Sequence, residues 1–226
     1  MNASSSFSLL TATLLLAACA GKPVPEWQSE AKDAMGRAST AYLKGENRVE
    51  QQEFTLARDE VSRTGKIDLL ARLELTRCAA RVASLVLEDC NGFDALARDT
   101  SAAEQAYADY LAGRVRAEQI RLLPEPQRTV AGAGSETAAA RAMQSIADPF
   151  SRLVAAGVLF RSNRATPDVL QAAIDTASAQ GWRRSLLAWL NVQALRAEQV
   201  GDGEEAQRIR RRMALVENKE DRKVTP

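Results

Sequence analysis

The sequence predicts an all-α fold built from antiparallel helical hairpins, and three observations support this expectation. Alanine, leucine, arginine and glutamate are abundant and aromatic residues make up only 5% of the chain, a composition that favours helices. We find no stretch with the apolar–polar alternation of period two that is typical of strands. Helix start signals recur instead, such as Asp148-Pro149 and Thr166-Pro167, in which a capping residue precedes a proline at the first helical position.

The N-terminal segment is expected to be a signal peptide. Residues Leu9 to Ala18 are uncharged and mostly apolar, but a run of this length is too short to cross a bilayer, which requires about 20 apolar residues. The tetrapeptide Leu16-Ala17-Ala18-Cys19 at its end resembles the lipobox of bacterial lipoproteins. This resemblance implies removal of residues 1–18, acylation of Cys19 as the first mature residue, and sorting to the outer membrane because Ala20 follows the cysteine.

An apolar first helix with a buried Cys19 is the alternative interpretation of this segment. It has some support, because no Lys or Arg precedes the apolar run, whereas secretory signals normally begin with positive charge. Gly21, Pro23 and Pro25 oppose the alternative, since they would end such a helix. We expect residues 19–25 to form a lipidated tether whose last six residues span at most about 20 Å.

Helical periodicity divides the rest of the chain into two halves and a tail. Residues 26–131 form the N-terminal half, residues 132–216 the C-terminal half, and residues 217–226 a charged tail. Joints of only a few residues imply that consecutive helices lie antiparallel. The expected helices cover residues 26–44, 47–63, 66–85, 93–97, 102–112, 115–123, 135–146, 149–161, 167–179, 182–200 and 203–216.

Two further expectations concern the helix pattern. Pro124 and Pro126 interrupt the periodicity, so no helix is expected between residues 124 and 131. The stretch 182–200 is the most apolar of the helices and has little polar surface, which is typical of a central, buried helix.

Cys78 and Cys90 are predicted to form a disulfide, because they are the two cysteines left in an exported chain. Their Cα atoms must lie within about 7 Å, whereas a helix carries the chain about 5.4 Å further with each turn. The helix that holds Cys78 must therefore stop by about Val86, and Glu88-Asp89 must turn the chain back. Two unpaired buried thiols are the alternative; the spacing matches no metal site.

Two hairpins resemble those of tetratricopeptide (TPR) repeats. Residues 201–206 (GDGEEA), with Ala194 seven positions before Gly201, resemble the TPR turn, and Ala38 and Gly45 share that spacing. The resemblance covers about a third of the mature chain and implies a stack of helical hairpins. The usual aromatic and proline positions and a clean 34-residue period are missing, so an irregular bundle of antiparallel helices is the alternative.

The final expected helix carries the only dense basic cluster. Arg208, Arg211 and Arg212 lie on one side of it at helical spacing, which makes them candidates for binding an anion such as a lipid head group or a peptidoglycan carboxylate. The other interpretation is a solvated face that interacts with the helix dipole, with Glu204 and Glu205 as partners.

Little in the sequence indicates catalysis. The chain has no histidine, which excludes Ser-His-Asp and Cys-His nucleophiles and His-based zinc sites. The remaining acid–base candidates, Glu104, Glu118, Asp148 and Asp175, fall on different expected helices. We therefore expect no enzyme activity, no cofactor and no metal site, and the formal net charge of +1 argues against nucleic-acid binding.

These observations predict a lipid-anchored protein of the outer membrane that faces the periplasm and acts as a protein-binding adaptor or assembly factor. Its expected partners are the membrane, through the lipid anchor, and an envelope protein, with peptidoglycan as a further candidate. Stacked hairpins form grooves that accept a partner helix or an extended peptide. The alternative is an accessory module that binds peptidoglycan or anionic lipid through the basic last helix.

Overall fold

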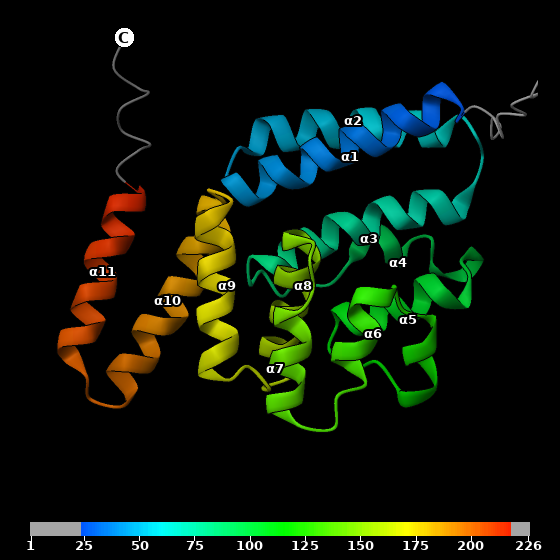
Figure 1. Cartoon of the computed structure of the whole chain (residues 1–226). Helices are drawn as coiled ribbons and strands as arrows, with labels where there is room; N and C mark the ends of the chain where they lie inside the picture. Colours follow the sequence, from blue (N-terminus) through cyan, green and yellow to red (C-terminus); the bar gives the residue numbers. More distant parts are fainter. Residues whose placement is uncertain (1–23, 218–226) are drawn as a thin grey trace, which may run out of the picture.

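The all-α prediction is confirmed by a computed structural model, which describes residues 24–217. This part of the chain forms eleven α-helices, two short 3-10 helices and no strand (Figure 1). The expected signal peptide, Cys19 and most of the expected tether lie outside the described residues, as does the tail beyond Glu217. Within residues 24–217, every helix is too short or too polar to span a bilayer.

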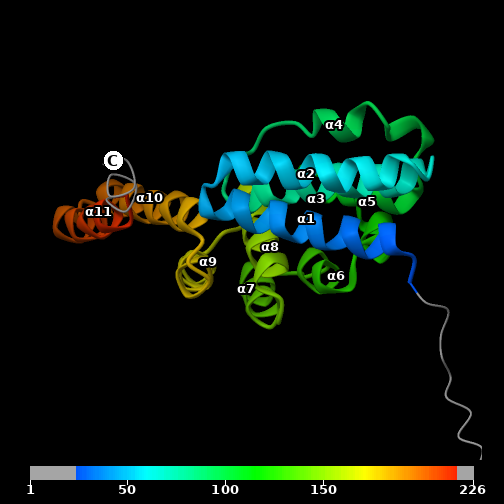
Figure 2. The same cartoon turned by 90° about the horizontal axis from the view of Figure 1, so that it is seen from above.

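The N-terminal helices form a hairpin that packs on a third helix. These are α1 (Glu26–Lys44), α2 (Asn47–Ser62) and α3 (Ile67–Ala83). Seen from above, α1 and α2 run side by side over α3, with α6, α7 and α8 on the side of α1 and α4 on the side of α2 (Figure 2). Gly45 ends α1 in the left-handed conformation, with φ of 89°, which a glycine adopts without strain.

Shorter elements follow α3, and longer helices return towards the end of the chain. The last two form a hairpin that extends away from the rest (Figure 2). The remaining elements are α4 (Asn91–Asp94), η1 (Ala97–Asp99), α5 (Ala102–Leu111), η2 (Ala117–Leu122), α6 (Glu125–Ala131), α7 (Glu136–Gln144), α8 (Pro149–Arg161), α9 (Pro167–Ala179), α10 (Arg183–Gln199) and α11 (Gly203–Glu217).

The predicted helix starts in the C-terminal half are confirmed by their caps. The Asp148 carboxylate accepts a hydrogen bond of 2.7 Å from the backbone N–H of Ser151. The hydroxyls of Ser135 and Thr166 likewise accept from the N–H three residues further on. Each such cap stabilises its helix by about 1 kcal/mol, which explains why these boundaries could be located from the sequence.

Two sequence expectations were wrong. Pro124 and Pro126 do not exclude a helix. Pro124 precedes α6 and Pro126 lies in its first turn, where backbone N–H groups have no partner within the helix, so a proline there costs no hydrogen bond. Helix α10 is not buried all round, because the Leu195 side chain on its outer face is 44% exposed. The more central helix is α8, in which every residue from Leu153 to Leu159 is buried.

Helix α8 packs closely on α3, and a glycine makes this contact possible. A Cβ added at Gly157 would lie only 2.3 Å from the carbonyl oxygen of Val82. Helix α10 joins the same end of α3, where the Trp189 indole donates to the Ala83 carbonyl at 3.1 Å. The main hydrophobic core thus includes residues from both sides of the 132–135 joint.

A second, smaller core lies under the free end of the N-terminal hairpin. It is formed by α1 and α2 together with one fully packed side chain of α3, Leu73. The far end of α1, at Tyr42 and Leu43, belongs instead to the main core. The hairpin is therefore anchored in the main core mainly at one end.

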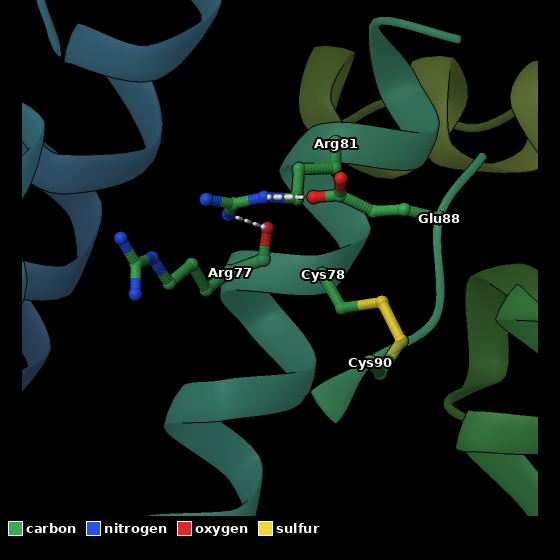
Figure 3. Close-up of a disulfide and its surroundings, with 5 residues drawn as sticks. All are labelled: Arg77, Cys78, Arg81, Glu88 and Cys90. Atoms are coloured by element: carbon green, nitrogen blue, oxygen red, sulfur yellow. Dashed lines mark hydrogen bonds and ion pairs between the residues drawn. A yellow bond between two sulfur atoms is a disulfide. The ribbon is translucent and has the colours of Figure 1, made fainter. Parts of the chain in front are cut away.

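The predicted disulfide joins Cys78 of α3 to Cys90, with their Cα atoms 5.7 Å apart. As expected from the geometry, α3 ends early, at Ala83, and Leu85 turns the chain with a positive φ of 58°. Figure 3 shows the returning segment beside α3. There the Arg81 guanidinium donates to Glu88 at 2.9 Å, so an ion pair and the disulfide both hold this turn.

Candidate functional site

A groove with a volume of about 940 Å³ runs along α1, and we refer to it as the α1–α3 groove. Pairs of adjacent α1 residues line it at every fourth position, so α1 presents one continuous stripe. The opposite wall comes from α3, and the start of α8 and the α9–α10 connection form the remaining side. The α1 stripe consists of Trp27, Gln28, Ala31, Lys32, Met35, Gly36, Ser39, Thr40 and Leu43. The α3 wall consists of Lys66, Leu69, Arg72, Leu73 and Thr76.

The lining of the groove is mainly apolar. Met35 and Leu73 lie in its floor and are almost completely buried, while Trp27 and Phe150 are half-buried near its ends. Gly36 has no side chain, and a Cβ at this position would meet no atom within 4 Å, so the α1 wall leaves open space there. The accessible apolar surface of the groove is therefore supplied mainly by half-buried side chains such as Trp27, Leu69 and Phe150.

One polar group in the groove has no partner. Ser39 is 7% exposed, and its hydroxyl oxygen makes no hydrogen bond within residues 24–217. A buried hydroxyl without a partner destabilises a fold by about 1–3 kcal/mol. Because the hydroxyl oxygen is itself buried, a ligand in the groove could reach it only if neighbouring side chains moved.

The charged residues around the groove are mostly basic. Lys32 and Lys66 are exposed on opposite walls, and the Lys66 ammonium lies 5.9 Å from the centre of the Trp27 ring. Asp148 is the one carboxylate in the lining, and it already caps α8. The lining therefore carries more positive than negative charge.

Arg72 lies in the α3 wall of the groove. Its charge is neutralised by Glu104 of α5, which accepts a hydrogen bond of 2.7 Å from the Arg72 guanidinium. Burial alone would raise the pKa of the Glu104 carboxyl, but hydrogen bonds from Ser101 and Arg72 outweigh burial and hold this pKa below its ordinary value. Glu104 is therefore ionised and fixes α5 to the groove wall.

Interactions on the far side of α3 hold the groove walls in place. Two ion pairs join α2 to α3, from Arg77 to Glu50 at 2.8 Å and from Arg58 to Glu74. At the end of α1, the Tyr42 ring lies between two guanidinium groups. The ring centre is 5.0 Å from the Arg81 guanidinium carbon of α3 and 4.0 Å from that of Arg184 of α10. Burial is the main reason why the pKa of the Tyr42 hydroxyl is raised, so it stays neutral.

The basic cluster lies on α11, at the edge of the molecule and away from the groove (Figure 1). Arg208 makes two bonds, of 2.6 and 2.5 Å, to Glu205 of its own helix. Arg211 is exposed and Arg212 half-buried, and neither has an ion pair or side-chain hydrogen bond in the described part of the chain. Glu205 is one of the partners proposed for a solvated face, and anion binding by this cluster stays a prediction.

The four carboxylates considered for catalysis are engaged separately. Glu104 pairs with Arg72, Asp148 caps α8, Glu118 is exposed and bonds to Arg116 at 2.7 Å, and Asp175 accepts from the side chain of Gln171 at 2.9 Å. No group of three or more Cys, Asp or Glu side chains that could hold a metal ion occurs between residues 24 and 217.

Sequence reasoning did not identify the groove. The α1 residues that line it recur as adjacent pairs every four positions and include the small residues Gly36, Ser39 and Thr40. The opposite side depends on where Phe150 and Trp182 are brought by the fold, and no local pattern encodes that placement.

No protein-family model, no curated protein and no solved structure matches the chain. The resemblance to TPR hairpins and to bacterial lipoproteins therefore rests on the sequence motifs themselves, and the function must be argued from the groove and its surroundings.

Proposed function

We propose that this chain is a lipid-anchored adaptor of the bacterial envelope that binds a segment of another protein in the α1–α3 groove. The observation that carries the proposal is the groove itself, about 940 Å³ in volume, with a mainly apolar lining. An exposed, mainly apolar concavity of this size is typical of a binding site.

The position of the groove supports a role near the membrane. It opens at Pro25 and Trp27, at the start of the described chain, and Cys19 precedes Pro25 by six residues. Six extended residues span at most about 20 Å. A lipid on Cys19 would hold the groove within that distance of the bilayer and raise the local concentration of membrane-associated partners.

Filling the groove tests the proposal. Gly36→Leu places a side chain in open space within the groove, whereas Gly203→Leu makes the same change in open space on α11. Envelope proteins crosslinked to the full-length wild-type chain in the producing cells should be lost with Gly36→Leu and retained with Gly203→Leu. Circular dichroism should confirm that both variants fold. An unchanged set of crosslinked proteins with Gly36→Leu would refute the assignment of the groove.

The accessory-module alternative is favoured by one observation, the absence of carboxylate partners for Arg211 and Arg212 among the described residues. If it is correct, Arg211→Gln with Arg212→Gln should release the protein from peptidoglycan sacculi and from anionic vesicles, and binding by the wild type should weaken as salt increases. Retention of binding by the double variant, together with insensitivity to salt, would eliminate this alternative.

A further inference from the structure

We infer that the segment bound in the α1–α3 groove is an amphipathic α-helix of four to five turns with acidic residues beside its apolar stripe. The inference rests on the proposed function and specifies the conformation and charge of the partner. Three observations carry it: the polar groups available in the groove, its length and volume, and the charge of its rim.

The groove offers a partner's backbone only separate polar side chains, such as Gln28, Thr40 and Gln180. Its long walls are the side chains of α1 and α3, whose own backbone groups are mostly bonded within the helices, and no strand edge exists within residues 24–217. An extended peptide would bury N–H and C=O groups without partners, at a considerable free-energy penalty. A helix satisfies its backbone internally and leaves only its apolar face to be covered.

The dimensions also fit a helix. The stripe from Trp27 to Leu43 is about 25 Å long at a rise of about 1.5 Å per residue. The groove, about 940 Å³ in volume, follows this whole stripe, so a helix of that length can lie along it with its other face in solvent.

The α1 wall allows close approach at its middle. Gly36 has no atom within 4 Å of a Cβ position, so a large apolar side chain of the partner can lie against it. Thr40, one turn further along α1, is half-buried in the same stripe and offers its hydroxyl to a polar side chain of the same helix. The site thus combines one apolar pocket with one polar contact.

The rim fixes the sign of the partner's charge. Lys32 and Lys66 stand on opposite walls, and no ion pair involves either of them in the described structure. Arg72 is already neutralised by Glu104, so Asp148 is the one negative charge in the lining, against the two lysines. A helix with Asp or Glu on both flanks of its apolar stripe complements this arrangement.

Site-specific photocrosslinking of the full-length chain in the producing cells tests the inference. A benzophenone amino acid replaces Gln28 or Thr40, one position at a time. These residues line the same stripe and lie about 18 Å apart along α1. On a bound helix the two crosslinked residues should be about twelve positions apart, and on an extended segment about five. Mass spectrometry of the crosslinked peptides gives this separation.

A charge-reversal variant tests whether the bound helix must be acidic. Lys32→Glu with Lys66→Glu should reduce the yield of these crosslinks at least about fivefold, because like charges then face each other. The matched control, Arg48→Glu with Arg141→Glu, makes the same change in net charge at exposed positions outside the groove and should leave the yield unchanged.

The outcomes separate the inference from the proposed function. A separation of about five residues, or a partner segment without Asp or Glu, would overturn the inference and leave the adaptor function intact. Crosslinks to lipid, to residues 1–23 of the same chain or to a second copy would overturn the inference and assign the groove to that occupant. Absence of any crosslink at both positions would overturn the inference and the proposed function together.

Discussion

A methyl group added at Gly157 should force α3 and α8 apart. In Gly157→Ala the new Cβ would lie 2.3 Å from the Val82 carbonyl oxygen and 2.9 Å from its carbonyl carbon. Contacts this short require the helices to separate by roughly 1 Å, and overpacking of this kind destabilises a core by about 1–3 kcal/mol. Alanine also favours a helix over glycine by about 1 kcal/mol, which offsets part of the penalty.

Gly36→Ala provides the matched control for this prediction. It has the same gain in helix propensity, but its Cβ meets no atom within 4 Å, so it should stabilise the protein by up to about 1 kcal/mol. Urea and thermal unfolding followed by circular dichroism measure both changes. For a chain of this size, 1 kcal/mol corresponds to about 2–4 °C in Tm.

The two glycine variants should therefore change Tm in opposite directions. If Gly157→Ala were as stable as Gly36→Ala, the close packing of α3 on α8 would be wrong. A lower Tm for Gly36→Ala would show that Gly36 is not on an open surface, and the groove would need to be redefined.

Three further predictions concern the disulfide, a buried carboxylate and the anchor. Cys78→Ser with Cys90→Ser should lower the free energy of unfolding by about 3 kcal/mol, and mass analysis without reductant should find no alkylatable thiol at these positions in the wild type. Burial opposes the shift, but bonds to Arg72 and to its own capping serine hold the pKa of Glu104 below its ordinary value. The ionised carboxyl therefore stabilises the fold above the ordinary carboxyl pKa of about 4.3, and this stabilisation is lost as the pH falls through the lowered folded-state pKa. Acid titration of unfolding should accordingly show a shallower loss of stability in Glu104→Gln; the same slope in both proteins would refute this. Cys19→Ala should abolish labelling with a radioactive or clickable fatty acid, and persistent labelling would contradict the lipid anchor.

Features set by neighbouring residues could be predicted from the sequence. Asp148 and Thr166 cap helices because the hydrogen bonds involved span three residues. The Cys78–Cys90 pairing was expected from the two remaining cysteines, and the limited reach of the segment between them then predicted the early end of α3. Where one residue type allows two local outcomes, the prediction was wrong: Pro126 was taken to interrupt a helix and instead lies in the first turn of one.

Features set by tertiary packing were not predicted. The apolar character of α10 indicated a central helix, but Leu195 is exposed because α10 contacts α9 and α11 on only part of its surface. The groove depends on the approach of Phe150 and Trp182 to α1, over separations of more than a hundred residues. Neither arrangement produces a periodic pattern in a single sequence.

The division into two hydrophobic cores determines how the protein would respond to force. If Cys19 carries a lipid, as proposed, the tether would pull where the described chain begins, at Val24, which is the end of the hairpin supported by the smaller core. The C-terminal end of α1 is held more firmly, because the Tyr42 ring there contacts the guanidinium groups of Arg81 and Arg184. Tension would therefore tend to rotate α1 about its end at Tyr42 and move its start away from α3, which would widen the groove between them. A helix bound in the groove would contact both α1 and α3 and oppose this movement, so tension on the tether and occupancy of the groove would be coupled.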